Sequence, residues 1–325
     1  MKGYLPRLMH IGVGLVCGGK ILDLINAGFD FTIFLADWHA WINNKLGGDM
    51  DKIKMVGEYF KHCFTALGIP PDKARYLWTS ELAEDRSYWE KVILIAKNVT
   101  INRARRALPI MGRSISAGEI ETAALIYPCM QVADIFHMNI DVACAGIDQR
   151  KAHMLAREMA PKFGLGKPVC IHTPLLADLE PPSRIEGKFD EDEALSFKIG
   201  AKMSKSMPAR CIFIHDSPEE IKHKINLAYC PPREVENNPI MDMARYVIFP
   251  RLGELTLNRP ERYGGLQTFN AFNELAEAYS KGLVHPLDLK NAVADALSNI
   301  LEDVRRYFKS HEELLRTVMG FEVTR

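Results

Sequence analysis

A glycine that separates an apolar helical stretch from a short apolar run constrains the fold of this chain most. Residues from about 15 to 26 have helical character, Asn26-Ala27-Gly28 interrupts them, and the aromatic and β-branched run 29–35 follows. Glycine commonly ends a helix because it adopts the left-handed conformation at little steric cost. A continuously apolar run of this length is typical of a strand buried on both faces of a parallel sheet. The start of the chain therefore predicts a helix that leads into a parallel strand.

The same alternation continues along the chain. Residues 51–67 read as an amphipathic helix, and strands are expected at 75–79 and 169–172. Alternating helices and strands predict an α/β fold whose parallel sheet is doubly wound, with helices on both faces. The fold class expected here is therefore a Rossmann-like doubly wound parallel sheet.

The second part of the chain is mainly helical. Ser217-Pro218-Glu219-Glu220 is a strong helix start, with proline at the first helical position and acids in the first turn. Helices are expected at 217–228, 239–249, 271–281 and 286–309, with a loop at 260–265. A length of 325 residues suggests two domains at a typical size of about 150 residues each. We expect a Rossmann-like α/β domain over 1–215 and a C-terminal mainly α-helical domain over 216–325.

Charge and cysteine usage exclude several classes of protein. Lysine plus arginine equals aspartate plus glutamate at 41 each, so a basic surface for nucleic acid would have to be local. The seven cysteines are scattered without a Cys-x-x-Cys pair, which argues against a disulfide framework and a structural zinc site. We expect a cytoplasmic protein with no resident metal, no signal peptide and no membrane span.

A loop over 201–207 has the composition of a phosphate-binding segment. Two lysines, Lys202 and Lys205, lie three positions apart among small and hydroxylated residues, and such donors can stabilise charge on phosphate oxygens. On composition alone, a solvated surface loop is the commoner interpretation. The string Lys202-Met203-Ser204-Lys205-Ser206 resembles the signature loop of class I aminoacyl-tRNA synthetases. That resemblance requires a His-x-Gly-x segment upstream, and His10-Ile11-Gly12-Val13 is present.

The segment His10 to Gly14 lies immediately before the first helix, where free backbone amides and the helix dipole favour an anion. Glycines let a nucleotide approach the backbone, and an imidazole can donate to a phosphate oxygen. In the family the fourth position of this signature is usually a second histidine, and Val13 stands there in this chain. The resemblance therefore implies ATP contacts from His10, Gly12, Gly14, Lys202, Met203, Ser204, Lys205 and Ser206, with His10 and the two lysines as the catalytic groups.

Tyr127, Gln131 and Asp134 share one face of any helix that contains them, because they are spaced i, i+4 and i+7. Taken alone, such a stripe is either a solvated face or the lining of a polar pocket. It resembles the substrate helix of archaeal and eukaryotic tyrosyl-tRNA synthetases. The resemblance implies that the first two residues hold the α-amino group of tyrosine and that Asp134 accepts a hydrogen bond from its hydroxyl group. A site of this kind rejects phenylalanine, which would leave a buried polar group unpaired.

The longest match to the same family is the segment 146–158, which begins Gly-Ile-Asp-Gln-Arg. Read singly, its residues describe a strand-to-helix turn followed by a charged helix. The resemblance implies that Gln149 also reaches the substrate amine and that Arg150 approaches the acceptor end of the tRNA. It further implies that the pocket is lined by Phe34, Ala36, His39 and Tyr88.

Contacts to tRNA are expected at both ends of the molecule. The helical stretch after Asn102 contains several arginines, for which a solvated helix is the default interpretation. In the family this central insertion, here about 95–145, forms the homodimer interface and touches the acceptor stem, which implies that Arg113 and Arg150 approach the first base pair. Segments 260–265 and 285–291 resemble the anticodon loops, with Tyr263 stacking on a base and His285 and Asp288 nearby. The alternative is that Tyr263 packs in a turn and Asp288 caps the following helix.

The resemblance implies an ATP-dependent ligase that activates L-tyrosine with Mg²⁺ and ATP and transfers it to tRNA(Tyr), as a cytoplasmic homodimer without membrane attachment. Two alternatives stay open: a tryptophanyl-tRNA synthetase, which resembles this chain less at the tyrosine-site positions, and a non-catalytic tRNA-binding relative. The second follows from Val13 and from the absence of a match, at Tyr4 or elsewhere before His10, for the upstream tyrosine that contacts the substrate hydroxyl group in the family. The acidic segment 177–199 is expected to be an exposed, mobile lead-in to the lysine loop.

Overall fold

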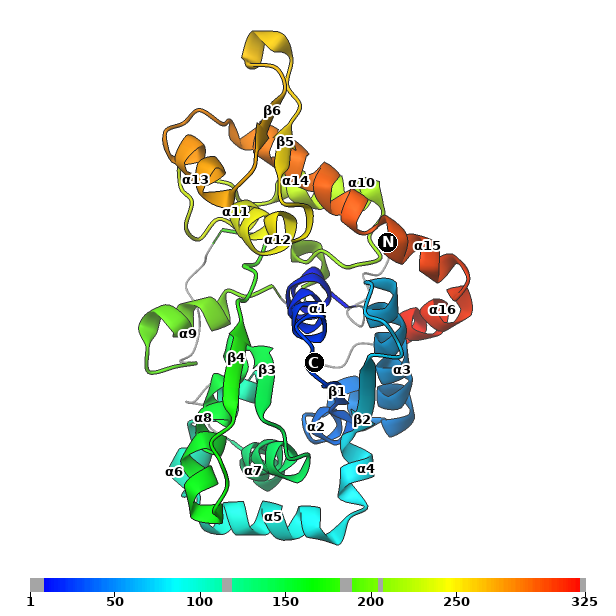
Figure 1. The fold of residues 1–325 in the computed structure, drawn as a ribbon, viewed down its shortest axis with the longest axis vertical. Helices are drawn as coiled ribbons and strands as arrows, with labels where there is room; N and C mark the ends of the chain where they lie inside the picture. The colour runs from blue at the N-terminus through cyan, green and yellow to red at the C-terminus, as the bar shows by residue number, and fades with distance from the viewer. Residues whose placement is uncertain (1–8, 113–118, 182–188, 204–206, 322–325) are drawn as a thin grey trace.

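The computed structural model describes residues 9–112, 119–181, 189–203 and 207–321 (Figure 1). Five residues with predicted or considered roles lie outside these ranges: Tyr4, Arg113, Ser204, Lys205 and Ser206. Their roles stay predictions.

The first part of the chain contains two pairs of parallel strands. β1 (Phe31–Leu35) pairs with β2 (Ala74–Trp78), and β3 (Val142–Gly146) pairs with β4 (Val169–Thr173). Figure 1 shows the two pairs on either side of the first helix, α1. The α/β class with parallel strands is confirmed, as are the strands expected at 29–35, 75–79 and 169–172. Within the described residues the strands form two separate pairs rather than one hydrogen-bonded sheet, and β3 was not expected.

Helices surround both strand pairs. The apolar stretch expected near the start is a helix that opens with a π-helical segment, and the helix expected at 51–67 begins where the Asp49 carboxylate accepts from the Lys52 amide at 3.1 Å. The helical segments of this half are η1 (Gly12–Cys17), α1 (Gly18–Asn26), α2 (Asp37–Ile42), η2 (Lys45–Gly48), α3 (Met50–Ala66), α4 (Thr79–Ala83), α5 (Arg86–Lys97), α6 (Ile101–Arg105), η3 (Leu108–Met111), α7 (Thr122–His137), η4 (Ile147–Gln149), α8 (Arg150–Met159) and η5 (Ala160–Phe163).

The lead-in to the lysine loop is more regular than expected. Residues Glu193–Gly200 form helix α9, whose N-terminus is capped by Asp192, with its carboxylate accepting from the Ala194 and Leu195 amides at 2.9 and 3.1 Å. A helix was not expected over 193–200, and the mobility of the lead-in stays a prediction. An aspartate cap followed by an acid in the first turn stabilises a helix there despite the high charge of the segment.

The C-terminal part is mainly helical, as predicted. Ser217 and Glu220 form a reciprocal capping box at the start of α10, which confirms the predicted helix start. An antiparallel hairpin that was not predicted, β5 with β6, carries the 260–265 loop at its tip and projects away from the helices (Figure 1). The elements are η6 (Pro208–Arg210), α10 (Pro218–Leu227), α11 (Pro239–Met243), η7 (Ala244–Ile248), α12 (Phe249–Leu252), β5 (Leu255–Leu257), η8 (Glu261–Tyr263), β6 (Gln267–Phe269), α13 (Phe272–Ser280), α14 (Pro286–Ile300), α15 (Glu302–Lys309) and α16 (Glu312–Gly320).

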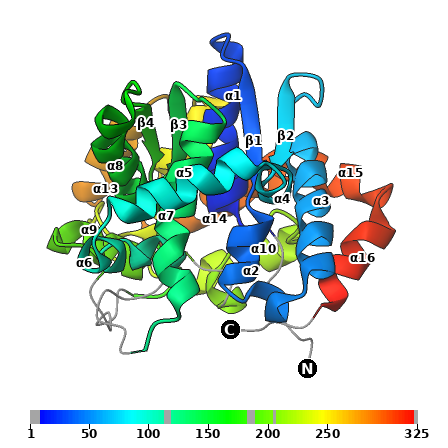
Figure 2. The same ribbon diagram turned by 90° about the horizontal axis from the view of Figure 1, so that it is seen from below.

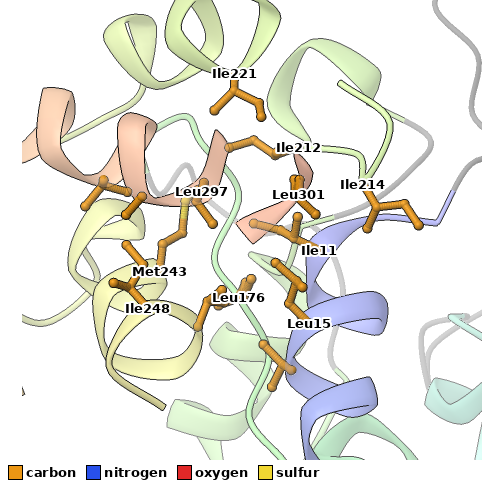
Figure 3. Packing of buried hydrophobic residues seen from close by; sticks show 14 of the residues in the cluster. Ile11, Leu15, Leu176, Ile212, Ile214, Ile221, Met243, Ile248, Leu297 and Leu301 are labelled. Carbon is orange, nitrogen blue, oxygen red and sulfur yellow. The ribbon is translucent and has the colours of Figure 1, made fainter. Parts of the chain in front are cut away.

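One hydrophobic core joins the first helix to the C-terminal helices. Ile11 and Leu15 belong to the same buried cluster as Leu297 and Leu301, and Figure 3 shows their side chains packed together with Leu176 and Ile212. Each such side chain stabilises the fold by about 1.5–3 kcal/mol when it is fully buried. Helices α15 and α16 also lie beside α3 (Figure 2). Packing is therefore continuous across the predicted boundary at 215/216, and the division into two domains stays a prediction.

Three global features complete the description. All seven cysteines are free thiols. Throughout the described ranges no helix is long and apolar enough to cross a membrane. The same residues contain no group of three or more histidine, cysteine, aspartate or glutamate side chains that could hold a metal ion.

Candidate active site

A buried cluster of polar side chains surrounds Asp134 on helix α7. The Tyr88 hydroxyl group, on α5, donates to Asp134 Oδ1 at 2.9 Å, and His39 Nε2, on α2, lies 3.2 Å from Asp134 Oδ2. Asp134 is only 3% exposed and Tyr88 is fully buried. Burial, together with the Asp134 carboxylate, raises the pKa of Tyr88 far above its ordinary value, so its hydroxyl group stays a donor. We call Tyr88, His39 and Asp134 the hydroxyl cluster.

His39 is held on three sides. Its Nδ1 lies 3.3 Å from the hydroxyl oxygen of Thr79. The rings of Tyr127 and Phe34 meet the His39 ring edge-on, with 4.8 and 6.3 Å between ring centres. The structure therefore brings together the predicted pocket residues Phe34, His39, Tyr88, Tyr127 and Asp134. Ala36, also predicted to line the pocket, is exposed at the end of β1.

Two glutamines continue the polar surface beyond the hydroxyl cluster. Gln131 Nε2 donates to Gln149 Oε1 at 3.2 Å, and Gln149 Nε2 donates to the carbonyl oxygen of Ile110 at 3.1 Å. Gln131 Oε1 is buried and accepts no hydrogen bond from any described residue. A buried acceptor without a donor is costly, so this oxygen suits a ligand that carries N–H groups, such as an ammonium. Tyr127, Gln131 and Asp134 thus lie on the one helix that their spacing required, and Gln149 contacts Gln131 from a separate element.

The histidine segment before α1 differs from the expectation in one respect. The amides of Val13 and Gly14 donate to the carbonyl oxygen of His10 at 3.0 and 2.9 Å, and the Gly12 amide donates to His10 Nδ1 at 3.2 Å. The expectation of free amides here is therefore wrong, because His10 itself accepts from three of them. An anion could therefore replace only the imidazole, as the acceptor for the Gly12 amide.

The two glycines of this segment have different surroundings. A methyl group at Gly12 would lie 3.0 Å from the His10 ring, so a side chain there would displace the imidazole. A methyl group at Gly14 would lie 2.9 Å from Ile214 and 3.0 Å from Leu67, both of which belong to the core. Packing accounts for Gly14, and its predicted place in the nucleotide site stays a prediction.

The described part of the lysine loop is anchored beside the histidine segment. Lys202 forms an isolated bridge with Ala177, and the Met203 amide donates to the carbonyl oxygen of Leu176 at 2.7 Å. Leu176 also lies 3.9 Å from the position of a methyl group on Gly12, so the two signature segments adjoin. Met203 is 3% exposed, which makes it a core residue as well as a candidate ATP contact.

The Lys202 ammonium group forms an ion pair with Asp148, with 2.5 Å between Nζ and Oδ2. Asp148 directly precedes Gln149, so this pair links the lysine loop to the segment that carries Gln149. Sequence reasoning missed both Asp148 and Thr79. Their partners are 54 and 40 positions away along the chain, and no local pattern signals such contacts.

A cavity of about 760 Å³ lies between the end of β4, α9 and the start of α11. Of the predicted site residues that the structure describes, Arg150 alone lines it. Carboxylates outnumber cations on its walls, which makes the cavity a poor site for a phosphate backbone. The charged residues that line it are Arg150, Lys198, Arg210, Asp178, Glu180, Asp190, Asp192, Glu236 and Asp242.

The candidate tRNA contacts are mostly exposed. Tyr263 is 62% exposed at the hairpin tip, with the Arg262 guanidinium 4.9 Å from its ring centre. His285 Nδ1 accepts from the Leu287 amide at 3.2 Å, so His285 caps α14, and the alternative that Asp288 is the cap is wrong. In the central insertion, the Arg103 guanidinium donates to the two carboxylate oxygens of Glu158 at 2.9 and 3.1 Å, and its contact with phosphates stays a prediction.

The model of one protein family, "tRNA synthetases class I (W and Y)", matches residues 6–302. The chain belongs to this family. Tyrosine–tRNA ligase of Aeropyrum pernix is 46% identical over 305 residues, covering 93% of this chain and 83% of that protein. The structure of tyrosyl-tRNA synthetase complexed with L-tyrosine from Pyrococcus horikoshii matches with a TM-score of 0.88 and 45% identity, covering 96% of this chain and 87% of that one. Tryptophanyl-tRNA synthetase of Aeropyrum pernix shares the fold alone, with a TM-score of 0.67 and 19% identity over 97% and 79% of the two chains.

Proposed function

We propose that this class I synthetase is a tyrosine–tRNA ligase, which activates L-tyrosine with ATP and transfers it to the 3′ end of tRNA(Tyr). The observation that carries the proposal is the buried Asp134 carboxylate, 3% exposed, together with Gln131 on the same helix. The side-chain amide oxygen of Gln131 is buried and accepts no hydrogen bond from the described residues. A carboxylate acceptor at one end and amide acceptors at the other match the hydroxyl and ammonium groups of tyrosine. The similarity to tyrosine–tRNA ligases over nearly the whole chain supports the same substrate over tryptophan.

Recognition of the amino acid follows from these groups. The tyrosine hydroxyl group donates to Asp134, and the ammonium group donates to Gln131 Oε1, with Tyr127 and Gln149 beside it. Phenylalanine would bury the same carboxylate without supplying a donor to it. The ratio of kcat/KM values should therefore favour tyrosine over phenylalanine by roughly 10⁴–10⁵. Phe34, Ala36, His39 and Tyr88 complete the wall of the pocket in this proposal.

The first reaction step needs no side chain as a nucleophile. A carboxylate oxygen of tyrosine attacks the α-phosphorus of ATP, the bond to the bridging oxygen breaks, and pyrophosphate leaves with its electron pair. Catalysis is then positioning together with stabilisation of charge on the phosphate oxygens. His10 and Lys202 lie on adjoining segments and supply part of that stabilisation, with Gly12, Gly14 and Met203 shaping the backbone around the nucleotide and Ser204, Lys205 and Ser206 extending the loop.

Lys202 must change partner to take part in this step. Its ammonium group lies against Asp148, so a phosphate oxygen would replace that carboxylate when ATP binds. Mg²⁺ would accompany ATP and neutralise part of its charge. The described residues offer no cluster of three potential metal ligands, so the ion would be held largely by the phosphates.

In the second step, a hydroxyl group of the terminal ribose of the tRNA attacks the carbonyl carbon of tyrosyl-adenylate, and AMP leaves. Arg150, exposed at the start of α8, and Arg113 are proposed to meet the acceptor end. Tyr263, His285 and Asp288 are proposed to meet the anticodon, where the exposed Tyr263 ring offers a stacking surface.

Two further features belong to the proposal. Ile93, Leu94 and Ile101, on α5 and α6, are 57%, 45% and 70% exposed, and an apolar surface beside the central insertion supports assembly as a homodimer. Seven free thiols support a reducing cytoplasmic location.

The test is exchange of labelled pyrophosphate into ATP with tyrosine, phenylalanine and tryptophan in parallel. Exchange with tyrosine alone is the expected result. Exchange with tryptophan would move the substrate to the sister enzyme. A folded chain that binds tRNA and exchanges with none of the three would instead be a non-catalytic tRNA-binding relative.

A further inference from the structure

His39 carries a buried nitrogen that makes no hydrogen bond with the part of the chain that the structure describes. His39 is 4% exposed, and Nε2 lies 3.2 Å from Asp134 Oδ2, yet the direction of the ring nitrogen misses that oxygen, so neither described residues nor their hydroxyl groups complete a bond to it. Buried polar groups are usually paired because an unmade hydrogen bond costs the full desolvation of the group. Nε2 and Oδ2 therefore form a close pair of polar atoms that a third polar atom can bridge.

The surroundings of the ring decide which nitrogen carries the proton. A carboxylate oxygen 3.2 Å from Nε2 repels a lone pair and favours a proton on that nitrogen. Nδ1 is then the acceptor, and the Thr79 hydroxyl group, 3.3 Å away and fully buried, is the donor that faces it. Thr79 thus supports the tautomer in which Nε2 donates.

Neighbouring side chains hold the ring in this position. Tyr127 and Phe34 meet it edge-on from two elements, α7 and β1, and Tyr88 occupies the other oxygen of Asp134. The donor at Nε2 and the acceptor at Oδ2 are therefore held 3.2 Å apart.

We infer that His39 is a second hydroxyl-recognising residue, acting together with Asp134, and that Thr79 is the positioning residue which sets its tautomer. A phenolic oxygen carries one proton and has lone pairs to spare, so it can donate to Asp134 and accept from His39 at the same time. An oxygen about 2.8 Å from each atom satisfies both contacts, because Nε2 and Oδ2 are close enough to share it. This inference rests on the proposed function and assigns two hydrogen bonds, rather than one, to the tyrosine hydroxyl group.

A change of substrate separates the two contacts. 4-Aminophenylalanine keeps a donor for Asp134, but its ring-conjugated nitrogen is a poor acceptor and leaves the His39 donor unpaired. The measurement is kcat/KM for pyrophosphate exchange with tyrosine and with 4-aminophenylalanine, in the wild-type chain and in His39→Leu. Removing the donor is expected to lower the tyrosine to 4-aminophenylalanine ratio about tenfold, the effect of one hydrogen bond of ordinary strength.

Conservative variants separate recognition from structure. His39→Gln, whose side-chain amide can place a donor near the position of Nε2, is expected to retain most of the ratio. Thr79→Val removes the hydroxyl group without leaving a cavity and should lower the ratio in the same direction as His39→Leu, whereas Thr79→Ser should keep it. If His39→Leu does not fold, the matched pair at Thr79 supplies the same comparison.

The outcomes distinguish the inference from the function on which it rests. No tyrosine-dependent exchange by the folded wild-type chain overturns the proposed function and the two-residue recognition with it. Exchange with tyrosine, but with the same substrate ratio in wild type, His39→Leu and Thr79→Val, overturns the role of His39 alone. A reduced ratio in both variants, restored in Thr79→Ser, supports it.

Discussion

The polar groups of the hydroxyl cluster and those at the C-terminal hairpin contrast in burial. Asp134 is 3% exposed and its two oxygens face Tyr88 and His39, whereas Tyr263 is 62% exposed at the hairpin tip. A buried polar group lowers stability or affinity whenever a partner is missing, while an exposed one is solvated by water when it is unbound. Strict selection should therefore come from the hydroxyl cluster, and the hairpin should contribute affinity. The Lys202 side chain, which is partly buried beside Asp148, is intermediate in exposure between Asp134 and Tyr263.

The largest expected effect comes from removing the carboxylate of the hydroxyl cluster. Asp134→Ala should lower the preference for tyrosine over phenylalanine by roughly 10⁴, because the pocket then lacks the acceptor that phenylalanine leaves unpaired. The measurement is the ratio of kcat/KM values for the two amino acids in pyrophosphate exchange. Asp141→Ala, an exposed aspartate just before β3, is the control and should leave the ratio unchanged. An unaltered preference in Asp134→Ala would remove Asp134 from this role.

Replacing the partly buried lysine should have a smaller effect, on a different step. Lys202→Met should slow formation of tyrosyl-adenylate about 10²-fold, the cost of losing one group that stabilises charge in the transition state. Equilibrium binding of tyrosine should stay the same, because the Lys202 ammonium group is paired with Asp148, which is not part of the hydroxyl cluster. Single-turnover kinetics and calorimetry separate the two quantities. Lys162→Met, an exposed lysine, is the matched control, and a normal rate in Lys202→Met would contradict the role.

The contrast between buried and exposed groups also predicts how the stability of the fold depends on pH, through the buried His153. Burial and the neighbouring His172 lower the pKa of His153 from 6.5 to about 4. Below pH 6.5 the unfolded chain binds a proton that the folded chain does not, so this group destabilises the fold increasingly as the pH falls toward 4. At pH 5 the free energy of unfolding should be about 2 kcal/mol lower than at pH 7 on account of His153 alone.

Urea denaturation at pH 7 and pH 5 tests this difference. His153→Gln should lose less stability than the wild type over that range, and His223→Gln, which changes an exposed histidine on α10, should lose as much as the wild type. Equal pH dependence in all three proteins would show that His153 titrates normally in the fold.

The smallest effect is expected at the hairpin tip. Tyr263→Ala should raise KM for the tRNA about fivefold, the lower end of the contribution of a stacked base, since Arg262 already covers part of the ring. Tyrosine-dependent pyrophosphate exchange, which needs no tRNA, should not change. Leu227→Ala, at an exposed leucine on α10, is the control for surface substitution. Loss of exchange activity in Tyr263→Ala would mean that the hairpin contributes to the fold of the catalytic part.

Local patterns predicted the elements that have strong periodicity. The helix-to-strand turn at Gly28, the amphipathic α3 and the Ser217 helix start were all found where the residues indicated them. β3 escaped prediction because its residues, Val142–Gly146, are mostly small and resemble a loop in composition. The strands β5 and β6 are three residues each, too short for alternation to be visible.

The candidate site could be predicted only as separate segments. The spacing of Tyr127, Gln131 and Asp134 placed them on one face of a helix, and the structure confirms that arrangement. Which residues face them depends on contacts across the fold, such as Thr79 with His39 and Asp148 with Lys202, and these pairs carry no local signal. The amides after His10 were expected to be free because a helix N-terminus usually leaves them so, but the carbonyl oxygen and ring of one residue accept from all three.

The core shared by Ile11, Leu15, Leu297 and Leu301 affects the order in which the chain folds during synthesis. The first helix emerges from the ribosome early, yet Leu297 on α14 and Leu301 just after it are made more than 280 positions later (297 − 15 = 282). Contacts of such long sequence separation form late because the intervening chain must first be ordered. We expect nascent chains that stop before α14 to expose Ile11 and Leu15 and to depend on chaperones until synthesis passes residue 301.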